Sequence, residues 1–255
     1  MKIILVSLVT ISFWSTAIAQ RSAPDQLKTN SGSVSIQPVL HGTTVLTLNN
    51  QTIYIDPYGG AQAFEGIAPP TLIFITDIHG DHMNIEILQA IETGQAIIIA
   101  PQAVFEKLPD DLKNKTKTLG NGEKTEVGGI HVTAVPMYNL PEDPESRHTK
   151  GRGNGYILNI GGKNIYFSGD TEDIPEMRSL KNIDVAFLCM NQPYTMEVEQ
   201  AASAVLYFKP HIVYPYHYRG SGGLSDVDRF RELVTSMDKN IEVRLRNWYP
   251  EYKSQ

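Results

Sequence analysis

Four side chains that can bind a metal ion stand within six positions of one another in this chain of 255 residues. They follow an apolar run at residues 71–75, which predicts a buried strand, and precede a helix-like segment at residues 84–93. A loop held between two rigid elements can aim several side chains at one point. Imidazole and carboxylate together suit zinc, manganese or iron better than calcium or magnesium. The sequence therefore predicts a transition-metal site formed in part by Asp77, His79, Asp81 and His82.

Two more candidate ligands stand at the ends of predicted strands farther along the chain. Asp170 follows an apolar stretch at residues 164–168, and His217 closes another at residues 212–217. An aspartate at the end of a strand serves either as a metal ligand or as a plain turn residue, and position alone leaves both interpretations open.

These three segments together resemble the metallo-β-lactamase superfamily. The stretch from Thr76 to His82 is similar to its His-x-His-x-Asp-His signature, except that Asp77 stands where the family has its first histidine. The segment Ser168-Gly169-Asp170-Thr171 looks like the family strand whose aspartate bridges two metals, and the strand ending in His217 looks like its last ligand-bearing strand. The resemblance covers residues 34–251. Within the superfamily, the pattern is most similar to the broad hydrolase group that includes ascorbate-6-phosphate lactonase and the N-acyl-phosphatidylethanolamine phospholipases.

The resemblance implies an α+β fold, the four-layer αβ/βα sandwich, with the site along one edge of two facing sheets. It implies one metal held by Asp77, His79 and His148, and a second held by Asp81, His82 and His217, with Asp170 between them. One or two divalent ions are expected, zinc first. Manganese or iron is the alternative, because an aspartate oxygen at position 77 is a harder ligand than imidazole.

The last histidine ligand must come from a long irregular segment at residues 136–155, and two positions compete for it. Many superfamily members carry it where Asn139 stands, whereas a subgroup carries it farther along, where His148 precedes a glycine-containing run. We assign His148 as the ligand, against the alternative of a mobile surface histidine. Asn139 and Tyr194 are then expected to bind substrate, with a supporting role behind the ligands as the alternative for Asn139.

The implied activity is hydrolysis by a metal-bound hydroxide, which Asp81 would orient, acting on an ester, lactone, amide or phosphodiester bond. A small-molecule substrate is expected, but no segment specifies which. The alternative function is a catalytically decayed protein that binds metal or ligand without turnover, which the departure at Asp77 keeps open.

The first 19 residues have the pattern of a signal peptide. Lys2 gives a basic start, an apolar run follows, and Ala17-Ile18-Ala19 is a cleavage signal. A membrane anchor is the weaker alternative, since the run is short and contains several hydroxyl side chains. We therefore expect export to the periplasm or the medium, a flexible polar tail at residues 20–33, and one hydrolase domain at residues 34–255.

Composition excludes some partners. The formal net charge is −6 and no basic stripe or cluster occurs, so nucleic acid and anionic membrane surfaces are poor candidates. Cys189 is the only cysteine and is expected to be a buried core residue. Nothing in the sequence fixes the oligomeric state. We also expect Asp56 to be a turn residue before Pro57, with an approach to the metal site as the alternative. His41 is expected to be a surface or turn histidine, with a ligand as the alternative.

The remaining elements follow from periodicity. Further helices are expected at residues 102–108 and 197–208, and a last one begins near Ser225 and Asp228. Further strands are expected at residues 34–40, 44–48, 52–55, 96–100, 116–119, 124–127, 130–135, 156–160, 184–189 and 241–246.

Overall fold

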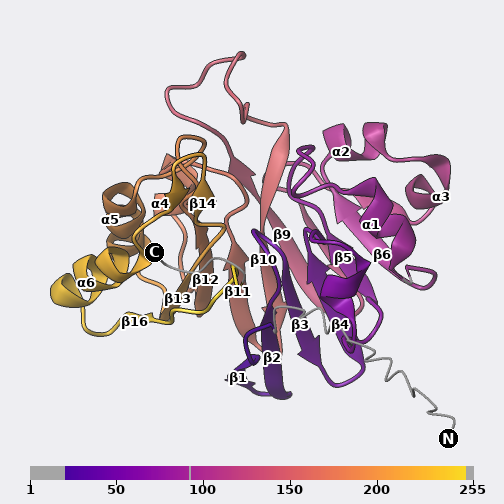
Figure 1. The fold of residues 1–255 in the computed structure, drawn as a ribbon, viewed down its shortest axis with the longest axis horizontal. Helices are drawn as coiled ribbons and strands as arrows, with labels where there is room; N and C mark the ends of the chain where they lie inside the picture. The colour runs from indigo at the N-terminus through magenta and orange to yellow at the C-terminus, as the bar shows by residue number, and fades with distance from the viewer. Residues whose placement is uncertain (1–20, 92, 251–255) are drawn as a thin grey trace, which may run out of the picture.

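The computed structural model describes residues 21–91 and 93–250. The expected signal peptide, residues 1–19, lies outside the described residues. Within them, two seven-stranded sheets pack face to face, and helices cover the outer face of each sheet (Figure 1). The expected α+β sandwich with helices outside is confirmed.

The first sheet is built from the N-terminal half of the described chain. Its first four strands run antiparallel, and its last four, which share β4 with them, run parallel. The strands across the sheet, in order, are β1 (Asp25–Thr29), β2 (Gly32–Pro38), β3 (Thr44–Leu48), β4 (Gln51–Ile55), β5 (Leu72–Phe74), β6 (Ile97–Ala100) and β7 (Thr116–Thr118).

The second sheet repeats this plan with the C-terminal half. Four of its strands run parallel, from β16 to β11, and the rest are antiparallel. The strands across it, in order, are β16 (Glu242–Val243), β13 (Ile212–Tyr216), β12 (Val185–Cys189), β11 (Lys163–Phe167), β10 (Gly153–Ile160), β9 (Ile130–Met137) and β8 (Lys124–Val127). A separate small hairpin joins β14 (Arg219–Gly220) to β15 (Gly223–Leu224).

The helices divide between the two outer faces (Figure 1). Outside the first sheet lie α1 (Ile85–Ala90), α2 (Gln102–Lys107) and α3 (Asp110–Lys113), and the 3₁₀ helix η1 (Ala61–Phe64) follows β4. Outside the second sheet lie α4 (Pro175–Arg178), α5 (Val198–Phe208) and α6 (Val227–Met237). Among the described residues, none of these helices combines the length and the apolar character that crossing a bilayer requires.

The central strands are apolar on both faces because both faces are covered. In β5, Leu72 and Phe74 belong to the core between the sheets, while the intervening Ile73 packs under the first-sheet helices. This explains why the strand reads as a continuous apolar run instead of an alternating one. Cys189 is buried at the end of β12, as expected, and burial raises the pKa of its thiol to about 12.

The expected flexible tail at residues 20–33 is corrected for its described C-terminal part. Residues 25–29 form β1, which pairs antiparallel with β2 through a tight turn at residues 30–31. The segment looked like a tail because only Leu27 of β1 is buried, so an edge strand with polar side chains lacks the usual apolar signal.

Element ends differ from the sequence-based expectations in small ways. The first helix ends at Ala90 instead of residue 93. The last strand was expected at residues 241–246, but β16 contains only Glu242 and Val243. Asp226, not Ser225, caps α6, since its carboxylate accepts the backbone N–H of Arg229. The short helices α3 and α4 were not expected, because four residues give too little periodicity to detect.

Candidate metal centre

The segment from Thr76 to His82 leaves the carboxyl end of β5 and folds into a tight turn. The carbonyl of His79 accepts the backbone N–H groups of His82 and Met83, at 3.0 and 2.8 Å. Asn84 then caps α1 by accepting the N–H of Ile87. The turn therefore holds the side chains of this segment at fixed positions between a buried strand and a capped helix.

The second sheet brings its donors to the same edge. Asp170 follows β11 and His217 follows β13, and these two parallel strands end on the same side. His148 comes from the loop between β9 and β10, which projects at the top of Figure 1. Strand β10 approaches the loop of Thr76 closely: the N–H of Asn154 donates to its carbonyl, and a Cβ on Gly153 would lie 2.9 Å from that oxygen. Glycine at position 153 is what permits this approach.

One donor group consists of Asp77, His79 and His148, whose ligand atoms all lie within 4.8 Å of one another. Nδ1 of His79 is 2.7 Å from Oδ2 of Asp77, and Nε2 of His148 is 3.9 Å from the same oxygen. His148, which the sequence analysis chose over Asn139, thus lies in this donor group, and its binding of metal stays a prediction.

A second donor group consists of His82, Asp170 and His217. The Nε2 atoms of the two histidines are 3.2 Å apart, and each lies within 3.5 Å of an Asp170 oxygen. Asp81 adds an oxygen 3.3 Å from Nε2 of His217. Asp170 also lies 3.4 Å from Nε2 of His148, so it stands between the two groups. All seven predicted ligands are thus brought together, while their binding of metal stays a prediction.

The centre contains buried polar atoms that lack a hydrogen-bond partner. They include both ring nitrogens of His148, Nδ1 of His217 and Oδ1 of Asp170. An unpaired buried donor or acceptor costs roughly 1–3 kcal/mol, so several in one place need a compensating partner. Convergent imidazole and carboxylate atoms without protein partners fit a divalent transition metal.

Mutual proximity sets the charges of the centre. Burial alone would raise the pKa of Asp170, but His217 and His82 hold it well below its usual range. Burial alone would lower the pKa of His82, but Asp170, Asp56 and Asp81 raise it well above 6.5. Without metal, the fold therefore balances carboxylates against a protonated imidazole.

Asp56 has a role beyond the turn that the sequence indicated, because it holds the His82 ring. It is fully buried at the end of β4, and its carboxylate lies 2.8 Å from Nδ1 of His82. Thr76 donates both its backbone N–H and its hydroxyl to the same carboxylate, at 2.8 and 2.6 Å. This arrangement fixes the His82 ring so that Nε2 faces the donor group, as carboxylates behind metal-binding histidines do.

Arg152 is a site residue that sequence reasoning did not identify. Its guanidinium forms a fork across Asp77, with Nε at 3.1 Å from Oδ1 and Nη2 at 2.9 Å from Oδ2. Burial alone would raise the pKa of Asp77, but His79 and Arg152 lower it. Arg152 therefore offsets the extra negative charge that Asp77 brings in place of a histidine.

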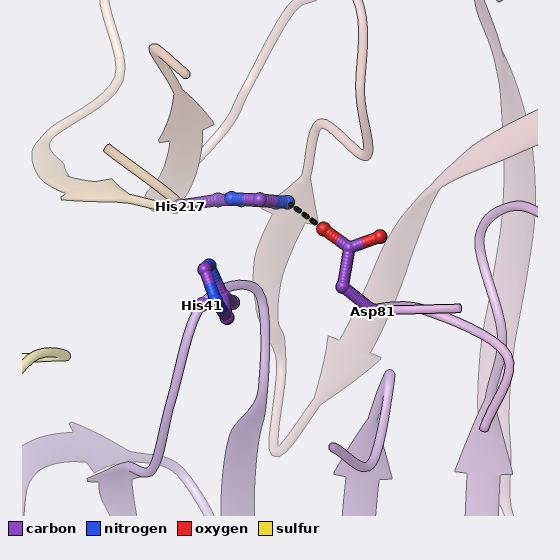
Figure 2. A group of neighbouring side chains, drawn as sticks. All are labelled: His41, Asp81 and His217. Carbon is purple, nitrogen blue, oxygen red and sulfur yellow. Dashed lines mark ion pairs between the residues drawn. The ribbon is translucent and has the colours of Figure 1, made fainter. Parts of the chain in front are cut away.

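His41 also lies at the centre and not at an unrelated surface turn. One of its ring nitrogens is within 4.8 Å of an Asp81 oxygen and a His217 ring nitrogen, and Figure 2 shows the three side chains facing one another. Burial and the neighbouring His217 lower the pKa of His41 to about 4, so its ring is neutral at pH 7.

The two residues expected to bind substrate lie beside the His148 loop. The side chain of Asn139 accepts the backbone N–H of His148 and donates to the carbonyl of Tyr194, at 2.9 and 2.8 Å. Its polar atoms are engaged, which favours the alternative of a supporting role. Tyr194 is partly exposed and its ring lies 4.4 Å beneath the Arg147 guanidinium, so binding of substrate there stays a prediction.

Comparison with known families agrees with this geometry. The family profile described as "Beta-lactamase superfamily domain" matches residues 51–218. The chain belongs to the metallo-β-lactamase superfamily. Within it, the chain is a member of the UPF0173 metal-dependent hydrolases: such a protein from Pyrococcus abyssi is 31% identical over 206 residues, covering 76% of this chain and 90% of that protein. One from Thermococcus onnurineus is 31% identical over 196 residues, covering 73% and 86%.

Solved structures of the metallo-β-lactamase fold match as well. A candidate metal-dependent hydrolase from Parabacteroides distasonis has 38% identity and a TM-score of 0.77, covering 88% of this chain and 97% of that one. A metallo hydrolase from Ignicoccus hospitalis shares the fold at 23% identity, with a TM-score of 0.70 and coverage of 84% and 95%. The protein is therefore a metal-dependent hydrolase with its cluster of histidines and aspartates in place.

Proposed function

We propose that this hydrolase is an exported enzyme with a two-metal centre, and that it cleaves an ester, lactone, amide or phosphodiester bond in a small molecule. The observation that carries the proposal is the convergence of seven donor side chains around buried atoms without protein partners. Two donor groups on either side of Asp170 support two metal positions more than one.

The protein residues have separable roles in such a reaction. A bound divalent metal would supply Lewis-acid activation of water and of the scissile group. Asp81 is the most exposed of the seven donors, with 32% of its side chain accessible, whereas the side chain of His79 is 23% exposed and that of Asp170 is 4% exposed. His82 and His217 lower the pKa of Asp81 against the effect of burial, so it remains a carboxylate that accepts a hydrogen bond from an approaching water. We assign the orientation of the attacking water to Asp81.

Zinc is the metal we propose first, with manganese or iron as the alternatives. Asp77 by itself would favour the harder metals, but its fork with Arg152 reduces the negative charge that it presents. The other donors of the first group are imidazoles, which suit zinc.

Export is proposed from the first 19 residues and their Ala17-Ile18-Ala19 cleavage signal. Expression of the full chain in a bacterial host, followed by cell fractionation and N-terminal sequencing, tests it. We expect a periplasmic or secreted product that begins at Gln20. A full-length product in the cytoplasm contradicts export.

The test of the enzymatic proposal combines metal analysis with a substrate panel. The purified chain is loaded separately with zinc, manganese and iron(II), and metal is counted per chain. Each form is assayed with p-nitrophenyl esters, lactones, N-acyl amides and bis(p-nitrophenyl) phosphate. We expect up to two metals and turnover of one class, which Asp170→Asn abolishes and His131→Ala, on the exposed face of β9, leaves unchanged. Metal binding without turnover of any class is the result expected of a binding protein and contradicts the proposal.

A further inference from the structure

His41 occupies an unusual backbone position that is locked to the centre. It lies in the loop between β2 and β3 with φ of 51°, and its carbonyl accepts the backbone N–H of His217 at 3.2 Å. His217 itself has φ of 45°. Residues other than glycine rarely adopt a positive φ, although histidine does so more often than most, and residues with such backbone conformations concentrate at functional sites.

Aromatic rings on three sides fix the orientation of the His41 ring. Tyr58, His217 and Tyr249 pack edge-on against it, with ring centroids 5.4, 5.2 and 5.2 Å away. His41 and Asp81 are both partly exposed, while His217 is buried. The partly exposed side chains of His41 and Asp81 lie near each other (Figure 2), so a substrate oxygen that contacts one lies close to the other.

Tyr249 determines which ring nitrogen of His41 carries the proton. Its hydroxyl oxygen accepts the backbone N–H of Arg219 and lies 3.2 Å from Nδ1 of His41. Tyr249 is only 2% exposed, so its hydroxyl proton needs a partner in the protein, and Nδ1 is the acceptor it meets among the described residues. With Nδ1 accepting that hydroxyl proton, the ring holds its own proton on Nε2, since the hydrogen bond at one nitrogen sets the state of the other.

We propose that His41 presents its Nε2–H to an oxygen of the substrate on the Asp81 side of the centre, and that Tyr249 holds the ring in this tautomer. The ligand class is a carbonyl or phosphoryl oxygen that gains negative charge during hydrolysis, which a fixed N–H donor stabilises. This role rests on the proposed hydrolytic function. It differs from metal binding, because a nitrogen that carries a proton has no lone pair for a metal.

The first test measures which ring nitrogen of His41 carries the proton and how much metal the protein binds, and it does not depend on turnover. Histidine-ring ¹⁵N–¹H correlation spectra of the metal-free protein, assigned with His41→Asn, should show the proton of His41 on Nε2. In Tyr249→Phe that preference should be lost.

Asparagine is chosen for position 41 because it tolerates a left-handed backbone, and thermal unfolding checks that each variant is folded. Metal content and the cobalt(II) absorption spectrum should match wild type in His41→Asn. A proton on Nδ1, a lost metal or a changed cobalt spectrum overturns the proposal.

The second test measures how loss of the His41 donor changes turnover of substrate and the affinity for inorganic phosphate. With the class that the panel identifies, we expect His41→Asn to lower kcat by about 10²-fold with little change in KM, as loss of one such donor does elsewhere. Tyr249→Phe should lower it less, and His131→Ala not at all. Inorganic phosphate should bind the metal-loaded His41→Asn form about tenfold or more weakly than wild type. Unchanged kcat and unchanged phosphate affinity overturn the proposal. If wild type turns over nothing, the hydrolase proposal fails, while the tautomer and phosphate measurements still decide the role of His41.

Discussion

At the scale of single residues, the centre depends on side chains that act behind the metal donors. The sequence favoured other roles for Asp56 and His41 and gave no sign of Arg152, although it indicated all seven candidate donors. The donors sit in short segments with recognisable spacing, whereas Asp56 meets a partner 26 positions away and Arg152 one 75 positions away. Local spacing carries no signal for such pairings, because only the fold creates them.

Asp56 should matter to metal binding although it is not itself a donor of either group. In Asp56→Asn, which keeps a residue that tolerates the φ of 44° found there, the anchor of the His82 ring loses its charge. We expect metal affinity to fall about 10–100-fold, as for other residues behind metal-binding histidines. Competition with a chromophoric chelator measures it, with Asp111→Asn on the exposed end of α3 as control. Equal affinities would show that Asp56 only stabilises its turn.

Metal affinity should also depend on pH through His82. Its pKa in the metal-free fold is raised above 6.5, so the ring is protonated at neutral pH and must lose that proton before Nε2 can bind a metal. The stability that this proton gives the metal-free fold is present below 6.5 and lost as pH rises through the raised value. Metal affinity should therefore increase with pH, up to about tenfold per unit for one displaced proton. Calorimetry in buffers of different ionisation enthalpy counts the proton, and affinity independent of pH contradicts the prediction.

The pair of Asp77 and Arg152 should set both metal number and metal preference. Asp77→Ala removes a donor of the first group, so we expect the metal count to fall from two towards one. Arg152→Met leaves Asp77 with its full charge, which should shift preference from zinc towards manganese. Metal analysis after loading from an equimolar mixture measures both effects, with the exposed Arg231→Met as control. If Asp77→Ala keeps two metals, Asp77 is not a ligand.

At the scale of elements, the fold and the site were predictable to different extents. The buried parallel strands were predictable from their apolar runs, and six of the seven candidate ligands follow the carboxyl ends of these strands; the seventh, His148, lies in the loop between β9 and β10. The edge strand β1 and the short helices α3 and α4 were not predicted, because polar side chains and four-residue lengths leave no periodic pattern. The loop between β9 and β10 could be recognised as functional by its length, but its internal ties could not.

Asn139 holds that loop, so its removal should act on the metal centre through His148. Asn139→Ala breaks the hydrogen bonds to the His148 backbone and to Tyr194, which we expect to lower stability by about 1–3 kcal/mol. Metal affinity should fall with it, since His148 is no longer held. Thermal unfolding and metal titration test this, with Glu142→Ala on the same loop as control because its exposed ion pair contributes little. If Asn139→Ala changed only KM, the result would contradict this supporting role and favour a role of Asn139 in substrate binding.

At the scale of the whole molecule, the N-terminal hairpin belongs to the sandwich. The Asp25 carboxylate accepts hydrogen bonds from Tyr214 of β13 and from Arg246, at 2.8 and 2.6 Å, so the first sheet's edge strand is joined to the second sheet. The pKa of Asp25 is lowered, because these partners outweigh the effect of burial.

Removal of residues 21–33 should therefore destabilise the protein, although the sequence alone indicated a flexible tail at residues 20–33. The deletion uncovers Val34 and Ile36 of β2 and breaks the Asp25 contacts. We expect the melting temperature to fall by more than about 5 °C. Deletion of residues 21–24 alone is the control. Asp25→Asn should lose part of the same stability near neutral pH, and less of it at acid pH, where the wild-type carboxylate is protonated. Identical melting curves for both deletions would contradict the role of β1.

The donors of the centre come from both halves of the sandwich: Asp77 to His82 from the first sheet, and His148, Asp170 and His217 from the second. A metal bound there would add a cross-link between two halves that meet mainly through their apolar faces and through a few hydrogen bonds and ion pairs. Chelation would then do more than stop turnover, because it would free one edge of the sandwich to open. In a medium poor in transition metals, the same protein would become a better substrate for proteases, so that its lifetime would report the metal supply around it.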